Sequence, residues 1–237
     1  ARGAGTGLAG ESLGRGLVVD FAHGMRRIVG VDGDLVRVQP GVVHAQLNQF
    51  LAPYGRLFGP DPALSSVTTM GSVLALDGAG SHWLRYGSTS GRVESLQVVL
   101  ADGSQLEVGR HAVPTTDDLP AEGLPDSRLG TLVRRVAEIV RREAAVIAAH
   151  RPRSAVNRSG YHLHDLLDDG QLNLARLLVG SEGTLALITE ATLRVDPLPK
   201  VRGVALLFCD RLDAAARIAS TPLAKAPAPA TCSTGVC

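Results

Sequence analysis

Three glycines near the start of the chain have the spacing of a phosphate-binding loop. Gly5, Gly7 and Gly10 satisfy the pattern G-x-G-x-x-G, which in a nucleotide-binding βαβ unit places a pyrophosphate against the N-terminus of a helix. Residues 17–21, however, are predicted to form a short buried strand, where that unit requires a helix. Asp20 also comes at about half of the roughly 20-residue spacing expected for a ribose-binding carboxylate. The pattern therefore disfavours a Rossmann site.

A strand, a glycine-rich turn and a second strand offer another way to bind an anion. Successive backbone N–H groups in such a turn can point into one concavity, and glycine permits both positive φ angles and the close approach of a ligand. Arg2 would add a positive charge and Thr6 a hydroxyl donor, whereas the lysine of a nucleoside-triphosphate loop is absent. Taken alone, the stretch is equally consistent with a glycine-rich surface turn.

Histidine and cysteine spacing does not predict a metal site. His162 and His164 lie two residues apart, a spacing that points side chains in different directions on a helix. The three cysteines, at positions 209, 232 and 237, are too few and too late in the chain for a disulfide framework or a zinc site of four clustered ligands. Cys232 and Cys237 do not by their spacing define an iron–sulfur site.

The overall composition excludes several classes of partner. The 24 basic and 23 acidic side chains leave a formal charge of +1, so nucleic acid and anionic membrane surfaces are not expected partners. No apolar run has the length of a membrane span. The small number of cysteines favours a reducing, cytoplasmic setting. Because the chain begins at Ala1, within what looks like a motif, a targeting segment upstream remains open.

The elements that would position the glycine loop are predicted from short-range patterns. Residues 27–39 are predicted to form a hairpin that turns at Asp32-Gly33, and residues 94–100 and 105–108 a second hairpin. Residues 43–54 have the apolar spacing of a helix that ends at Gly55.

The second half of the chain alternates helices and strands. Apolar residues on one face predict a long helix over residues 126–150, with arginines on a solvated opposite face. Prolines 197 and 199 indicate a domain edge. The remaining predicted elements are a short helix at 172–178, a strand at 185–195, a strand at 201–208 and a helix at 212–219, followed by a tail at 226–237 without periodicity.

Five motifs in this order resemble one family. They are residues 2–10 (RGAGTGLAG), 60–66 (PDPALSS), 69–71 (TMG), 80–88 (GSHWLRYGS) and 180–185 (GSEGTL). Together they resemble the FAD-linked oxidases of the vanillyl-alcohol-oxidase superfamily, whose FAD-binding domain is of the PCMH type. The resemblance runs from Arg2 to about Pro199, and it is to the branch that includes glycolate oxidase, D-lactate dehydrogenase and D-2-hydroxyglutarate dehydrogenase.

The resemblance implies an α+β fold in two parts. Residues 1–199 would form a PCMH-type FAD-binding domain of two α+β subdomains, with its N-terminal strand–helix unit missing. Residues 200–237 would hold the first elements of a C-terminal α+β substrate domain and an irregular tail.

The resemblance also implies which residues contact FAD. The pyrophosphate would be wrapped by Arg2, Gly3, Ala4, Gly5, Thr6, Gly7 and Leu8. The middle of the cofactor would be lined by Pro60, Asp61, Thr69, Gly71 and Ser72, and its flavin end by Gly78, Ala79, Gly80 and Tyr86. Backbone contacts would come from Glu182, Gly183 and Ile188. No catalytic residue and no metal ligand are assigned.

Departures from the family pattern concern two side chains. Ser72 stands where the family usually has a second glycine, and Asp77 stands in place of an asparagine. A carboxylate near a pyrophosphate is repelled unless it turns away or pairs with a cation, for which Arg85 is the candidate.

His82 lies within a cofactor motif. We expect it to pack or to form hydrogen bonds, in preference to attaching the flavin or transferring a proton.

The implied activity is the oxidation of a 2-hydroxy acid. An FAD-dependent oxidoreductase of this kind removes a hydride from the α-carbon of glycolate, D-lactate or D-2-hydroxyglutarate and leaves the 2-oxo acid. Its partners would be the hydroxy acid and an electron-acceptor domain or subunit, either an iron–sulfur protein or quinone-linked. Two alternatives stay open: a flavin oxidase of another alcohol or sugar, and a degenerate, non-catalytic flavin-binding module.

Overall fold

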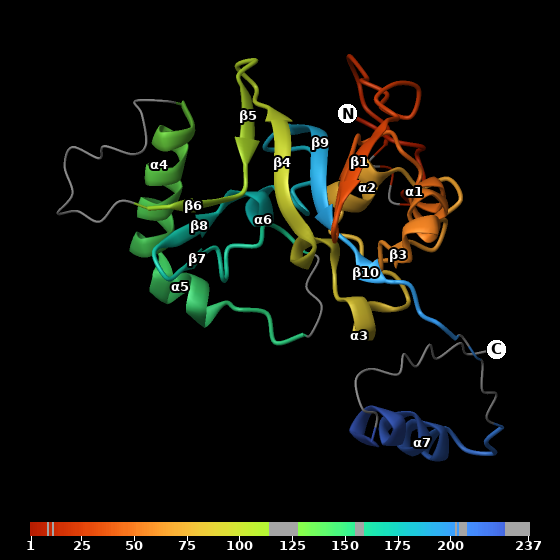
Figure 1. Cartoon of the computed structure of the whole chain (residues 1–237). Coiled ribbons are helices and arrows are strands. Elements are labelled where there is room, and N and C mark those ends of the chain that lie inside the picture. The colour runs from red at the N-terminus through yellow and green to blue at the C-terminus, as the bar shows by residue number, and fades with distance from the viewer. Residues whose placement is uncertain are drawn as a thin grey trace.

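The computed structural model describes residues 1–8, 10, 12–113, 128–154, 159–201, 203 and 208–225. Helices and strands are mixed along the chain and build three sheets with helices packed beside them (Figure 1). The α+β class predicted from the sequence is confirmed. No helix within the described residues is long and apolar enough to cross a membrane.

An antiparallel sheet of five strands lies at the centre, in the order β1-β2-β9-β4-β5. Its strands are β1 (Ile28–Asp32), β2 (Leu35–Val38), β4 (Val93–Val99), β5 (Gln105–Val108) and β9 (Leu187–Arg194). Both predicted hairpins, β1–β2 and β4–β5, are confirmed. The first turns at Gly33-Asp34, one residue later than predicted, because Asp32 still pairs with Leu35 and Gly33 supplies a positive φ of 59°. β9 joins the two hairpins into one sheet.

Short helices cover the sheet on the side of the first hairpin. They are α1 (His44–Leu51), the 3₁₀ turn η1 (Ala52–Tyr54), α2 (Met70–Ala75), α3 (Trp83–Tyr86) and the 3₁₀ turn η2 (Thr89–Gly91). The predicted end of the first helical segment at Gly55 is confirmed, since Gly55 adopts the left-handed conformation. β3 (Arg56–Leu57) pairs with β10 (Asp196–Pro197) and closes this region.

A small sheet and three helices follow on the other side. β6 (Arg110–Ala112), β8 (Gln171–Asn173) and β7 (Leu167–Asp168) pair in that order, beside α4 (Arg128–Arg142), α5 (Ala144–Ala149) and α6 (Leu174–Leu178). The long helix predicted over 126–150 is wrong as one piece, because Glu143 leaves helical geometry between α4 and α5. The helix predicted at 172–178 begins only at Leu174, because Leu172 pairs within the small sheet and the Asn173 side chain caps α6.

The buried strand predicted at residues 17–21 is wrong. Only Asp20 forms a bridge, in parallel with Arg2, and Leu17 is 94% exposed. Apolar side chains become buried in a strand only where a neighbouring layer covers them, and the described residues place no such layer over Leu17. Residues 17–20 are exposed and form the last part of the first loop, which comprises residues 1–21.

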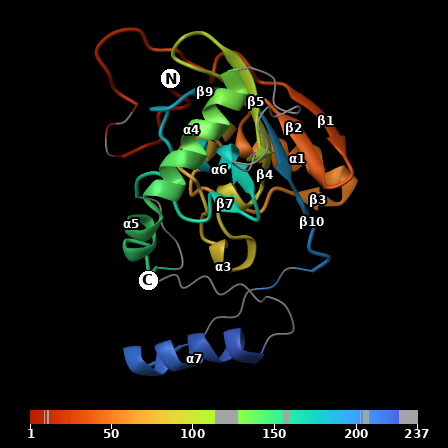
Figure 2. The same cartoon turned by 90° about the vertical axis from the view of Figure 1, so that its left-hand side faces the viewer.

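The C-terminal part adds one more helix. α7 (Leu212–Lys225) confirms the helix predicted at 212–219 and extends it. Figure 2 shows α7 apart from the sheets. Most of the strand predicted at 201–208 and the whole tail at 226–237 lie outside the described residues.

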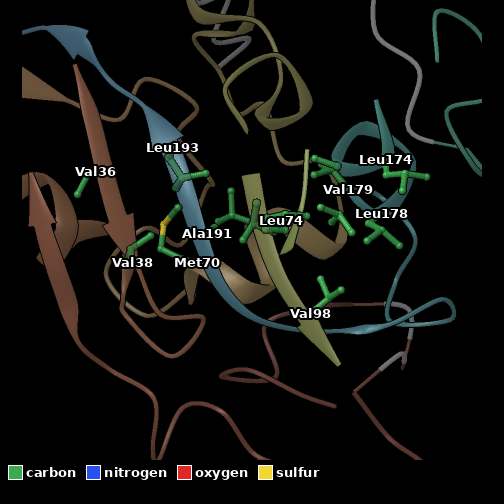
Figure 3. Packing of buried hydrophobic residues seen from close by; sticks show 14 of the residues in the cluster. Val36, Val38, Met70, Leu74, Val98, Leu174, Leu178, Val179, Ala191 and Leu193 are labelled. Atoms are coloured by element: carbon green, nitrogen blue, oxygen red, sulfur yellow. The ribbon is translucent and has the colours of Figure 1, made fainter. Parts of the chain in front are cut away.

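One hydrophobic core connects the five-stranded sheet with the three-stranded sheet. Met70 and Leu74 of α2 pack with Ala191 and Leu193 of β9, and the cluster continues to the side chains of α6 (Figure 3). Leu74 and Leu193 are fully buried. Because α2 and α6 share this core, the loops that leave them are held at fixed positions relative to each other.

Candidate functional site

A cavity of about 130 Å³ opens where three distant parts of the chain meet. Its walls come from the first loop, from the start of α2 and from the segment between α6 and β9. The residues that line it are Ala1, Arg2, Gly3, Gly5, Thr6, Gly7, Ser12, Phe21, Pro40, Thr69, Gly71, Ser72, Ala75, Leu76, Ser181, Glu182, Gly183, Ala186, Leu187 and Ile188.

Arg2 closes the first loop at its base. Its backbone N–H donates to the carbonyl of Val19 at 2.9 Å, and its carbonyl accepts from the N–H of Phe21 at 3.0 Å. The side chain lies 3.6 Å from the Asp20 carboxylate and extends beside Gly5, where Nη2 would be 3.5 Å from an added β-carbon. The loop therefore carries a cation at the cavity wall.

The first loop presents unused hydrogen-bond donors. Within the part of the chain that the structure describes, no hydrogen bond occupies the backbone N–H groups of Gly3, Gly5, Thr6 and Gly7. Gly5 has a positive φ of 71°, which allows the chain to turn around the cavity. Unpaired amide donors beside a guanidinium are suited to anionic oxygens.

The start of α2 forms the second wall and places two hydroxyl groups there. Thr69 caps the helix, its Oγ1 accepts from the N–H of Ser72, and the two hydroxyl oxygens lie 3.1 Å apart. A β-carbon at Gly71 would lie 2.8 Å from Cβ of Pro40, and one at Gly3 would overlap both hydroxyl groups. Glycine at positions 3 and 71 thus permits the walls to approach.

The third wall is held by backbone hydrogen bonds to α2. The N–H of Gly180 donates to the carbonyl of Leu74 at 2.9 Å, and that of Glu182 donates to the carbonyl of Ala75 at 3.0 Å. Glu182 adopts the left-handed region at φ 54°, an uncommon conformation for a residue with a side chain. Since its N–H is already used, Glu182 has only its carbonyl and side chain to offer a ligand.

The cavity gathers eleven of the residues that the sequence assigned to the cofactor. They are Arg2, Gly3, Gly5, Thr6, Gly7, Thr69, Gly71, Ser72, Glu182, Gly183 and Ile188. Another eight do not line it: Ala4, Leu8, Pro60, Asp61, Gly78, Ala79, Gly80 and Tyr86.

Sequence reasoning missed several lining residues. Ser181 was within reach, because it lies inside the motif at 180–185. Pro40 and Phe21 carried no signal, because Pro40 lines the cavity through its tertiary contact with Gly71 and Phe21 through its hydrogen bond to Arg2.

Asp61 faces a second cluster outside the cavity. Its Oδ2 lies 2.5 Å from Nδ1 of His82 and accepts from the Ser81 hydroxyl at 3.0 Å, while Oδ1 accepts from the His82 N–H at 3.1 Å. The Asp61 backbone forms a parallel bridge with Gly80, and its N–H donates to the carbonyl of Ala79. The packing and hydrogen-bonding role expected for His82 agrees with this arrangement.

Asp77 turns away from the cavity, and its partner is His162 instead of the candidate Arg85. The carboxylate is 1% exposed, its Oδ2 lies 3.0 Å from Nε2 of His162, and Oδ1 accepts from the N–H of Ser90 at 2.6 Å. Burial alone would raise the pKa of Asp77, but the contacts with His162 and Ser90 outweigh it and hold that pKa below its ordinary value of 3.8. The positive φ of Asp77, 48°, accompanies this inward direction, whereas Arg85 lies over the ring of Tyr86.

Comparison with known proteins finds a family match in the first part of the chain. Residues 1–109, which include the first loop and the whole of α2, match the family described as FAD binding domain. These residues are therefore similar to that FAD-binding family. The match supports FAD, the cofactor expected from the resemblance.

Similarity to known proteins extends beyond residue 109. It is 36% identical to the D-2-hydroxyglutarate dehydrogenase of Escherichia coli strain K12 over 91% of this chain and 21% of that protein. It is 30% identical to glycolate oxidase subunit GlcD of Bacillus subtilis strain 168 over 97% of this chain and 38% of that protein. A solved alkyldihydroxyacetonephosphate synthase matches at 21% identity with a TM-score of 0.45, over 77% of this chain and 23% of that one.

The curated relatives confirm the resemblance to the branch with D-2-hydroxyglutarate dehydrogenase and glycolate oxidase that the motifs indicated. The chain spans about a fifth of the length of the Escherichia coli dehydrogenase.

Proposed function

We propose that the chain binds FAD in the described cavity, with the pyrophosphate on the first loop. The observation that carries the proposal is the set of unpaired backbone N–H groups at Gly3, Gly5, Thr6 and Gly7 beside the guanidinium of Arg2. A pyrophosphate needs several donors and a positive charge in one concave surface, and this loop supplies both without a side chain in the way.

The other walls fit the same ligand. The hydroxyl groups of Thr69 and Ser72 would face the middle of the cofactor, and the absence of a β-carbon at Gly71 keeps that wall open. Gly183 and Ile188 would complete the groove from the third wall. When bound, FAD supplies a two-electron acceptor for substrate oxidation.

We place the flavin end beyond the cavity, along residues 60–61 and 78–80. The parallel bridge between Asp61 and Gly80 makes these two segments one surface, and Tyr86 packs against Gly59 next to it. In this proposal residues 1–199 form the FAD-binding domain, with residues 200–237 as the start of a substrate domain. Ala4 and Leu8 would contact the cofactor only from the outer rim of the first loop.

The position of Asp77 favours a functional groove over a degenerate one. A carboxylate at the cofactor would oppose a pyrophosphate, but Asp77 is buried against His162 and Ser90 and does not line the cavity. The reason to expect weakened FAD binding is therefore removed.

For the whole protein we propose the oxidation of a 2-hydroxy acid to the 2-oxo acid. Similarity to proteins named D-2-hydroxyglutarate dehydrogenase, glycolate oxidase subunit and D-lactate dehydrogenase supports this substrate class. The same proposal includes an electron acceptor, either an iron–sulfur protein or quinone-linked, and a cytoplasmic setting.

Titration with FAD tests the central claim. The purified chain should quench flavin fluorescence at a stoichiometry of one and keep a flavin absorbance spectrum after removal of free FAD. Protein that stays colourless after incubation with FAD would contradict the proposal. Anaerobic addition of D-2-hydroxyglutarate, D-lactate or glycolate to the FAD-loaded full-length protein should bleach the flavin. Bleaching by a sugar alone would point to the alternative substrate class.

A further inference from the structure

The third wall rests directly on a buried pair of polar residues. A β-carbon at Gly180 would lie 3.2 Å from Nε2 of His162 and 3.3 Å from Cβ of Asp77, so both side chains pack against the backbone of Gly180. The His162 side chain is 5% exposed and that of Asp77 is 1% exposed. The pair therefore supports the loop of residues 180–184 by packing against Gly180.

Asp77 is fixed to α2. Its N–H donates to the carbonyl of Leu74 at 3.3 Å, and the next residue, Gly78, donates to the carbonyl of Val73 at 2.8 Å. On the far side its carboxylate accepts two hydrogen bonds from Ser90. The carboxylate is thus held in place by contacts other than the one with His162.

His162 belongs to a segment that also touches the third wall from outside. The hydroxyl of Tyr161 lies 2.8 Å from Oγ1 of Thr184, and that threonine donates to the carbonyl of Ser181 at 2.6 Å. Residues 161–162 therefore contact the loop at two points: His162 packs against Gly180, and Tyr161 meets Thr184. A separate contact, between His162 and Asp77, connects this segment to α2.

We propose that Asp77 and His162 are positioning residues for cofactor binding. Their contact seats the loop of residues 180–184 on α2, which keeps the third wall in the place where it completes the groove. Neither side chain lines the cavity, so both act through the backbone of Gly180, Ser181 and Glu182. This inference rests on the proposed function for its effect on FAD, but the seating of the loop is a property of the protein without ligand.

Variants of His162 test the inference against a matched control. His162→Ala should weaken FAD binding by about 10-fold or more, since a tenfold change corresponds to about 1.4 kcal/mol, the scale of one buried polar contact. His162→Gln, which keeps a side-chain N–H to face Asp77, should recover binding to within about 3-fold of wild type. His164→Ala removes the neighbouring histidine, whose ring packs edge-on against His162. Within the described residues His164 forms no ion pair with Asp77, so this variant should bind FAD as wild type does.

Three measurements separate positioning from general stability. They are the FAD dissociation constant, the visible circular dichroism of the bound flavin, and amide hydrogen exchange at Gly180 and Glu182 in the protein without FAD. His162→Ala should speed exchange at these two amides and alter the dichroism of bound flavin, while His164→Ala should change neither. If His162→Ala does not fold, His162→Gln and Asp77→Asn are compared with His164→Ala in the same way, with faster exchange expected in Asp77→Asn.

The outcomes also separate the inference from the proposed function. If the wild-type protein binds no FAD, the proposed function is wrong. Amide hydrogen exchange at Gly180 and Glu182 still decides whether Asp77 and His162 hold the loop in place. Unchanged exchange and unchanged FAD binding in His162→Ala would overturn the inference even if the wild-type protein binds FAD. The inference is also overturned if His162→Ala loses FAD binding only to the extent that the variant is unfolded.

Discussion

Gly3 lies directly against the side chain of Thr69, at the point where the first loop meets α2. A β-carbon at Gly3 would overlap Oγ1 of Thr69 and the hydroxyl of Ser72, so glycine is required at position 3 by the approach of the two walls. The contact joins residues more than sixty positions apart in the sequence. It is the place where the proposed pyrophosphate site meets the proposed site for the middle of the cofactor.

Gly3→Ala should therefore separate these two walls. The added methyl group pushes the loop away from Thr69, and we expect FAD affinity to fall by about 10-fold or more. Fluorescence titration with FAD measures the change. Gly14→Ala is the matched control, because Gly14 lies in the same loop with open space around its β-carbon position and should bind FAD as wild type does. Equal affinity in the two variants would contradict the role of Gly3.

Gly5→Val should abolish retention of the cofactor. Gly5 has a positive φ of 71°, which costs a β-branched residue roughly 1–2 kcal/mol, and the added methyl groups would enter the space proposed for the pyrophosphate. Valine there should leave the protein colourless after FAD is added and free cofactor is removed. Gly5→Ala, which adds strain but little volume, should show an intermediate affinity. Unchanged FAD affinity in Gly5→Val would show that the loop is not the phosphate site.

Local patterns predicted the elements whose shape is set within a few residues. The β1–β2 hairpin follows from Asp32-Gly33, and the end of α1 and η1 follows from Gly55, because a positive φ at a glycine is needed at each place. The failure at residues 17–21 has the opposite cause. Alternating or continuous apolar residues form a buried strand only when another layer covers them, and Leu17 is exposed in the described structure.

The site itself was predictable only in part, because long-range contacts decide its walls. The glycine motif identified the first loop, but nothing in the sequence placed β9 between β2 and β4, and that insertion brings Ile188 to the cavity. No sequence pattern indicated the partner of Asp77 either. His162 is eighty-five positions away and carries no motif, so Arg85, which is nearer in sequence, was the candidate cation.

Arg92→Met should destabilise the region where β3 and β10 pair. Arg92 donates to Oδ1 of Asp196 at 2.8 Å and, through Nε and Nη2, to the carbonyl of Tyr86. Burial raises the pKa of Asp196, and Arg92 partly offsets this, so removal of the guanidinium leaves the carboxylate without its cation. We expect the free energy of unfolding to fall by about 2–3 kcal/mol in urea denaturation.

The control for this variant is Arg194→Met. Arg194 pairs with Asp34 and Glu94 at the surface, where all three side chains are about half exposed, so its loss should cost less than about 1 kcal/mol. A similar loss in both variants would mean that the partly buried Arg92 contacts contribute no more than surface ion pairs.

His44 should make stability fall under mildly acidic conditions. The ring is 3% exposed and packs edge-on against Phe58, and burial lowers its pKa from the ordinary value of 6.5, while the Pro60 carbonyl and the Asp61 charge oppose part of that change. Because the pKa is lower in the folded state, the unfolded state binds more protons below 6.5. The contribution of His44 is complete above 6.5 and is lost as the pH falls towards its folded pKa, with a slope of at most about 1.4 kcal/mol per pH unit.

Urea denaturation of wild type and His44→Gln at a series of pH values from about 7 to about 5 measures this dependence. Glutamine removes the titrating ring, so the decline in unfolding free energy over this range should be shallower in the variant. His111 and His164 also have a lowered pKa and remain in the variant, so the dependence should decrease without disappearing. An identical slope in the two proteins would mean that His44 is protonated equally in the folded and unfolded states.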